Sequence, residues 1–350
     1  MQICKKLIVY SFMFLVGFTI VLYVVNIIYE FDMEEYDTNK QWYLEENAVD
    51  VINAWHSKNV GEKEVIIAVI DTGVDYKHEL LKKHMWTNIS EIPNDGIDND
   101  NNGYVDDIIG WNFVENTNDV LTGTEYFEND HGTECASIIA SGDLKSEFKG
   151  INYSESIKIM SLKILSGIEK SGDVNNLIEA IKYAENNGAD ICNLSVNFDG
   201  YNAELSELIK HSEMTFIVSA GNDALDIDRE SVYLGSYNYN NVISVAAVDR
   251  YGELYQESNY GKNSVDIAAP GVEIYCAVVN GYDYDTGTSM ATAIVTGVCA
   301  MIISTNNTDD MCDLKNVLME TSYKRETLEN VVQCSGIVNA NNAINSVNYK

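Results

Sequence analysis

VIIAVIDTGVD, residues 65–75, decides the fold class of this chain. The apolar run from Val65 to Ile70 has the length and β-branched content of a buried strand, and Asp71 stands at its carboxyl end, before Thr72 and Gly73. Helical segments alternate with further strand-like runs, which cover residues 157–164, 189–196, 214–219 and 241–248. This alternation predicts an α/β fold with a mostly parallel central sheet and helices on both faces.

The clearest helix is predicted from about Val174 to Glu185. Asp173 is suited to cap its start, and Gly188 follows its end. Its apolar residues recur at helical spacing: Val174, Leu177, Ile178, Ile181 and Ala184. We interpret this stripe as a core face and not as a binding site.

Two later segments carry polar residues that would complete a catalytic group with Asp71. NDHGTECASIIAS (129–141) contains His131, and TGTSMATAIVTG (286–297) contains Ser289. Small and apolar residues follow both, which predicts that each side chain projects from the start of a helix. A serine hydroxyl becomes nucleophilic when an imidazole takes its proton and a carboxylate orients that imidazole. Each residue alone would also fit a structural role, so the combination carries the prediction of a serine protease.

The chain resembles the subtilisin-like serine proteases (subtilases), because its motifs follow the order Asp, His, Ser. The resemblance extends from about Gln41 to near the C-terminus. It implies a subtilisin-like fold and a serine endopeptidase that works through an acyl-enzyme. FIVSAGND (216–223) is similar to the family segment with the oxyanion-hole asparagine, so the resemblance assigns that role to Asn222, together with the backbone N–H of Ser289.

Subtilases bind substrates as an extended strand along exposed edges of the protease. The resemblance maps one edge to Lys170, Ser171 and Gly172. It maps the other to Ser195, Val196, Asn197 and Phe198. The family commonly has S-x-G-G at the second edge. Bulkier residues replace both glycines here, which predicts a narrower pocket.

A second chemically informative stretch, residues 98–107, is predicted to bind calcium. Oxygen-bearing side chains alternate along it before a glycine, as in the first half of an EF-hand loop, whereas the second half departs from that pattern. Many subtilases carry a similar insertion that binds structural Ca²⁺. The predicted ligands are Asp98, Asp100, Asn102, the carbonyl of Tyr104, and Asp106 or Asp107 to close the shell. The alternative is an ordinary acidic turn.

The N-terminal segment predicts membrane attachment. Residues 1–6 contain Lys5 and Lys6 and form the expected cytoplasmic tail, and the apolar residues 7–29 are long enough to span a bilayer. Residues 30–40 form an acidic linker, and residues 41–350 form the peptidase domain, which we expect outside the cell membrane. A cleaved signal peptide, which would release a secreted protein, is the alternative. No large pro-domain is expected between the anchor and the peptidase domain.

Net charge excludes one class of partner. The chain has 22 basic and 54 acidic side chains, which gives a net charge of −32, and so acidic a protein repels nucleic acid. Cysteines give a weaker signal: Cys312 and Cys334 are a plausible disulfide, and most of the others fit small buried hydrophobes.

The predicted function is limited processing of exported peptides or proteins by a membrane-anchored extracellular endopeptidase. A surface-bound nutritional protease is the broader version of this function. A catalytically silent, calcium-stabilised peptide-binding module is the alternative from another class.

Overall fold

The computed structural model describes residues 40–57, 61, 63–121, 130–143, 145–166, 171–198, 200–305 and 313–347. The predicted anchor over residues 7–29 and the linker up to residue 39 lie outside these ranges. Lys170 and Cys312 also lie outside them.

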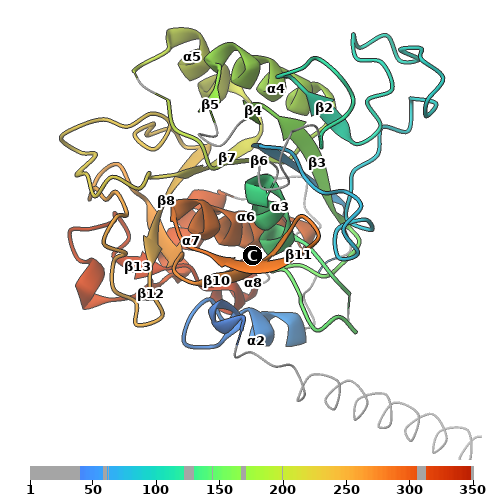
Figure 1. The fold of residues 1–350 in the computed structure, drawn as a ribbon. Helices are drawn as coiled ribbons and strands as arrows, with labels where there is room; N and C mark the ends of the chain where they lie inside the picture. The colour runs from blue at the N-terminus through green and yellow to red at the C-terminus, as the bar shows by residue number, and fades with distance from the viewer. Residues whose placement is uncertain are drawn as a thin grey trace, which may run out of the picture. The chain divides into compact units, whose positions relative to one another are not determined.

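A nine-stranded sheet forms the centre of the described domain, in the order β12-β13-β9-β8-β7-β6-β1-β3-β2 (Figure 1). Its strands are β1 (Val65–Asp71), β2 (Gly110–Asn112), β3 (Ile157–Lys163), β6 (Ile191–Leu194), β7 (Thr215–Ser219), β8 (Val242–Val248), β9 (Ile267–Pro270), β12 (Tyr323–Lys324) and β13 (Gly336–Ile337). All neighbours run parallel except β12 and β13, which are antiparallel. The predicted mostly parallel sheet is therefore confirmed.

Two short antiparallel ribbons stand beside this sheet. One pairs β4 (Leu165–Ser166) with β5 (Ser171–Gly172). The other pairs β10 (Ile274–Val278) with β11 (Gly281–Asp285) and leads directly into the helix that carries Ser289.

Helices cover both faces of the sheet, as predicted (Figure 1). On one face, α4 (Val174–Asn186) and α5 (Ala203–His211) enclose a core that includes Leu162 and Phe216. On the other face lie α3 (Asp130–Ile139) and α6 (Thr288–Thr305), which pack against each other. The shorter helices are α2 (Val51–His56), α7 (Leu314–Thr321) and α8 (Ala340–Val347), with 3₁₀ turns at Trp42–Leu44 and Glu326–Leu328.

The predicted helix of the sequence is α4. Its carboxylate cap is confirmed, because the Asp173 side chain accepts a hydrogen bond from the Asn175 N–H, and the stripe from Leu177 to Ala184 is buried. Among the described helices, α6 is the one long and apolar enough to cross a membrane, but 89% of it is buried inside the domain. It is therefore the central core helix.

Candidate active site

Asp71 ends β1 at the carboxyl edge of the sheet, where parallel α/β folds place their functional groups. Its side chain is fully buried. The Thr72 N–H donates to Asp71 Oδ1 over 2.6 Å, and the Ile164 N–H donates to the Asp71 carbonyl over 2.8 Å. Backbone donors from its own turn and from the residue after β3 thus hold the carboxylate and its main chain in place.

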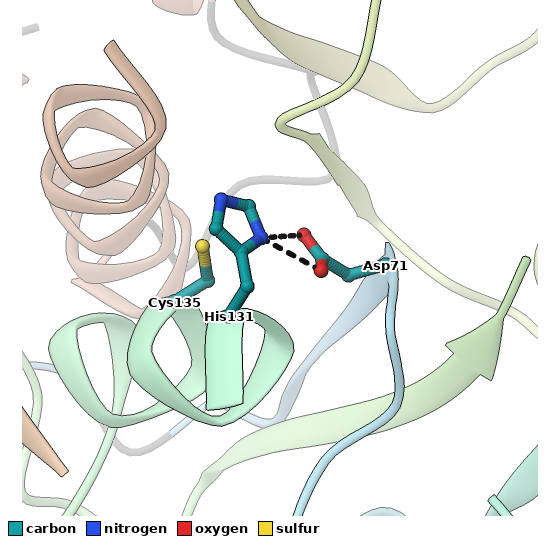
Figure 2. A group of neighbouring side chains, drawn as sticks. All are labelled: Asp71, His131 and Cys135. Carbon is teal, nitrogen blue, oxygen red and sulfur yellow. Dashed lines mark hydrogen bonds and ion pairs between the residues drawn. The ribbon is translucent and has the colours of Figure 1, made fainter. Parts of the chain in front are cut away.

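His131 is the second residue of α3 and points at Asp71 (Figure 2). Its Nδ1 lies 2.8 Å from Asp71 Oδ1 and 2.9 Å from Oδ2. A carboxylate only accepts hydrogen bonds, so this contact places the neutral ring's proton on Nδ1 and leaves Nε2 as a base. Gly132 allows this approach, because a Cβ at that position would lie 2.2 Å from the Gly73 carbonyl oxygen.

Cys135, one turn further along α3, lies beside the same imidazole (Figure 2). Ligand atoms of Asp71, His131 and Cys135 all lie within 4.8 Å of one another, a spacing that could hold a metal ion. Both Asp71 oxygens, however, lie at hydrogen-bond distance from the imidazole. This geometry suits an oriented base.

Ser289 is the second residue of α6 and is 8% exposed. Ser195 lies between the two helices: its Oγ is 3.8 Å from Cys135 Sγ and donates to the Ser289 carbonyl over 3.5 Å. Within the described ranges, no hydrogen bond joins His131 to the Ser289 hydroxyl. Catalytic hydrogen bonds are often long without substrate and tighten in the Michaelis complex.

Asn222 follows β7 and reaches the start of α6. Its Oδ1 accepts from the Thr288 N–H over 2.9 Å and from the Thr288 hydroxyl over 3.1 Å. With Oδ1 occupied, the Nδ2 amino group is the part of the side chain suited to donate to a substrate oxygen. Asn222 is exposed, so a substrate can reach it.

Asn259 supports this loop, and sequence reasoning missed it. Its Oδ1 accepts from the N–H groups of Asp223 and Leu225 over 3.0 and 2.9 Å, and its own N–H donates to the Gly221 carbonyl over 2.8 Å. Asn259 therefore fixes the turn that presents Asn222. It lies 37 residues further along the chain, so no local pattern pointed to it.

The two predicted substrate edges meet at one cavity of about 630 Å³. Gly172 of β5 and Phe198 both line it, as do Tyr201, Tyr233 and Tyr237. Ser195 is half-buried, Val196 is buried and Asn197 is exposed. Ser171 pairs with Ser166 of β4. An aromatic cavity between two extended segments suits an apolar peptide side chain.

Tyr233 occupies one backbone donor of the second edge, because its carbonyl accepts a hydrogen bond from the Phe198 N–H over 2.7 Å. Burial raises the pKa of Tyr237 to about 12, so its phenol stays neutral. Tyr237 therefore adds no charge to the wall of the cavity.

The acidic stretch brings oxygen ligands together, but not in the predicted set. Carboxylate oxygens of Glu91, Asp100 and Asp107 lie within 4.8 Å of one another, two of the three residues being buried. Desolvation raises the pKa of the Asp107 carboxyl, opposed by hydrogen bonds from Tyr183, Asn102 and Asn88. These three carboxylates are hard oxygen donors whose negative charge exceeds the positive charge of nearby side chains, an environment that fits Ca²⁺. Glu91 was missed because it precedes the loop.

The other predicted ligands make different contacts. Asp98 accepts from the N–H groups of Asn102 and Gly103 over 3.1 and 2.8 Å, and Asp106 accepts from the Gly96 N–H over 3.0 Å. The Tyr104 ring packs edge-on against Trp111 and Tyr183, which leaves its carbonyl, the predicted ligand, untested. These residues shape the loop around the three converging carboxylates.

The structure contradicts the predicted disulfide at Cys334, the one of its two cysteines that is described. Cys334 is a free, buried thiol, and its Sγ donates to the Gly336 carbonyl over 3.5 Å at the start of β13. The local turn therefore satisfies the thiol without a bridge to Cys312.

The fold and this constellation define an α/β protein with an aspartate, a histidine and a serine at one edge of a parallel sheet. The model of the subtilase family matches residues 62–342, and the chain belongs to that family of serine proteases.

Curated relatives match most of the chain. Subtilisin-like protease 1 of Plasmodium berghei (strain Anka) is 30% identical over 336 residues, which cover 89% of this chain and 55% of the relative. The thermophilic serine proteinase of Bacillus sp. (strain AK1) is 31% identical over 262 residues, covering 74% of this chain and 56% of the relative. The chain thus spans about half the length of the curated relatives it matches.

Solved structures share the fold. A structure described as the basis of subtilase cytotoxin SubAB assembly aligns with a TM-score of 0.68 at 24% identity, covering 87% of this chain and 96% of the other. A cold adapted subtilisin-like serine proteinase aligns with a TM-score of 0.59 at 24% identity, covering 81% and 89%. These likenesses confirm the subtilisin-like fold.

Proposed function

We propose that this chain is a serine endopeptidase in which Ser289 is the nucleophile, His131 the general base and acid, Asp71 the orienting carboxylate and Asn222 an oxyanion donor. The observation that carries the proposal is the double contact of Asp71 with His131 Nδ1, at 2.8 and 2.9 Å, on a helix that packs against the one bearing Ser289. A buried, oriented imidazole beside a helix-start serine suits acyl transfer.

The chemistry follows from these positions. His131 Nε2 takes the Ser289 hydroxyl proton while Oγ bonds to the peptide carbonyl carbon. The resulting oxyanion accepts from Asn222 Nδ2 and from the Ser289 N–H. His131 then gives its proton to the departing amine as the C–N bond breaks. Water, deprotonated by the same imidazole, bonds to the acyl carbon; the bond from that carbon to Ser289 Oγ then breaks, Oγ takes the proton back from His131, and the product leaves as a carboxylic acid.

We also infer structural Ca²⁺ at Glu91, Asp100 and Asp107, whose converging carboxylates support it. A bound divalent cation would offset most of the negative charge of these groups and hold the loop from residue 88 to residue 107. The catalytic residues themselves need no metal for the steps above.

The substrate and location are further parts of this proposal. An apolar segment at residues 7–29 with a basic flank supports a membrane anchor and an external catalytic domain. The bulky residues Asn197 and Phe198 at the second edge support limited processing of exported peptides or proteins. Profiling cleavage over a peptide library distinguishes the two protease roles, because a nutritional protease would cut many sequences at similar rates.

A silent peptide-binding module is the competing function, since the aromatic cavity alone could hold a peptide. Fluorophosphonate labelling of the full-length chain in detergent with Ca²⁺ separates the two. We expect labelling of the wild type and of Ser231→Ala, an exposed serine outside the proposed catalytic group, and its loss in Ser289→Ala. A folded wild type that resists the probe would contradict the protease function.

A further inference from the structure

Lys163, the last residue of β3, is 1% exposed, and a lysine is rarely buried unless its charge or donors are used. It pairs in register with Asp71. We propose that Lys163 is a positioning residue for the catalytic pair, and that its ammonium group supplies a positive charge on the strand next to Asp71. This inference rests on the endopeptidase function proposed above.

The sheet directs both side chains to the same face. Ile70 and Leu162 belong to the core beneath α4. Successive side chains alternate across a strand, so the next residues, Asp71 and Lys163, point to the opposite face, which α3 covers. The lysine therefore flanks the catalytic carboxylate from the neighbouring strand.

Thr72 connects the lysine to both members of the pair. Lys163 Nζ donates to the Thr72 carbonyl in a short hydrogen bond. The Thr72 N–H donates to Asp71 Oδ1 over 2.6 Å, and the Thr72 hydroxyl accepts from the Gly132 N–H over 3.0 Å. One residue held by Lys163 thus fixes the carboxylate and the first turn of α3.

β3 holds the rest of this turn with uncharged groups. Ser161 Oγ accepts from the Val74 N–H over 3.1 Å, and the Ile164 N–H donates to the Asp71 carbonyl over 2.8 Å. Lys163 differs from these two residues in carrying a charge. Its loss should therefore have an electrostatic effect that loss of Ser161 lacks.

The sign of that effect follows from Coulomb's law in a buried site. A positive charge beside Asp71 opposes protonation of His131, so its removal stabilises the imidazolium and moves the acid limb of the activity profile to higher pH. The titratable or charged groups on the elements around His131 are Asp71 of β1, Lys158 and Lys163 of β3, Tyr275 and Cys276 of β10, and Asp130, Glu134 and Cys135 of α3 itself. Ser289 and the rest of the first two turns of α6 add no such group.

Fluorophosphonate labelling rates of the full-length chain, measured across pH, test the inference. In Lys163→Met we expect the acid limb to move up by on the order of one pH unit. Ser161→Ala is the matched control: it loosens the same turn without changing charge and should keep the acid limb of the wild type. Circular dichroism of each variant verifies its fold.

Lys163→Gln replaces Lys163→Met if the latter does not fold, because glutamine keeps a side-chain N–H donor but carries no charge. The same upward shift is expected from it. An acid limb that coincides with that of the wild type, in a folded and labelled variant, would overturn the role of Lys163. Failure of the wild type to label would instead contradict the endopeptidase function.

Discussion

Gly132 controls how closely α3 approaches the end of β1. A Cβ at this position would lie 2.2 Å from the Gly73 carbonyl oxygen and 3.3 Å from Asp71 Cβ, and both neighbours belong to the strand end that the site needs. The position after His131 therefore requires glycine because there is no room for a Cβ, and not because the residue takes part in catalysis.

We predict that Gly132→Ala displaces α3 and separates His131 from Asp71. Overpacking of this kind typically costs about 1–3 kcal/mol, and the labelling rate should fall more than stability alone explains. Denaturant unfolding and fluorophosphonate labelling measure the two effects. Gly281→Ala is the control, because the nearest atom to its Cβ would be 4.0 Å away. Equal labelling of both variants would contradict the contact argument.

His84 is a buried histidine outside the site. Its Nε2 lies 2.9 Å from the Gly142 carbonyl oxygen and its Nδ1 lies 3.4 Å from that of Ile157. Burial lowers the pKa of His84 below its ordinary value of 6.5, although the two carbonyls oppose the shift. The folded chain therefore disfavours the imidazolium that the unfolded chain accepts at mildly acidic pH.

The lowered pKa of His84 predicts that the free energy of unfolding depends on pH. The free energy of unfolding contributed by His84 is fully present above pH 6.5 and falls as the pH decreases from 6.5 toward the lowered pKa. Urea unfolding at several pH values measures it, with the wild type losing more stability on acidification than His84→Gln. His56→Gln, at an exposed position, is the control and should behave as the wild type. Matching pH dependence in His84→Gln would refute the prediction.

At the scale of elements, the sequence predicted those with long patterns. Apolar runs predicted the ends of β1, β3, β7 and β8 to within about one residue, and helical spacing predicted α4 with its cap. The two-residue strands β4, β5, β12 and β13 were not predicted, because so short a segment shows no periodicity. Asn259 escaped notice for another reason: a tertiary contact alone brings it to the loop of Asn222.

The loop that ends in Asp107 gives the prediction at this scale. We expect Ca²⁺ at a hundredfold excess over its dissociation constant to stabilise the chain by about 2.7 kcal/mol, and chelation to remove that gain. Glu91→Gln removes one negative ligand and should lower the affinity roughly tenfold or more. Thermal unfolding against Ca²⁺ concentration measures both. Glu115→Gln, at an exposed position, should titrate as the wild type; an unchanged midpoint in Glu91→Gln would argue for an ordinary acidic turn.

At the scale of the whole molecule, the site draws on the full length of the domain. Asp71, His131, Asn222 and Ser289 come from the ends of β1 and β7 and the starts of α3 and α6, and motif order alone predicted their grouping. What the sequence could not provide was the network beneath them, such as the contact of Lys163 with Thr72, because such contacts depend on strand register.

The burial of α6 has a consequence for the order of events during synthesis. This helix packs against β1, β6, β7, β8 and β9 and carries Ser289 on its first turn. A nascent chain that has not yet delivered Ser289 lacks the proposed nucleophile, and one that has not delivered residue 305 lacks the full helix against which the sheet packs. A polypeptide that stops short of Ser289 therefore cannot carry out the proposed acyl transfer, whatever part of the sheet has already formed.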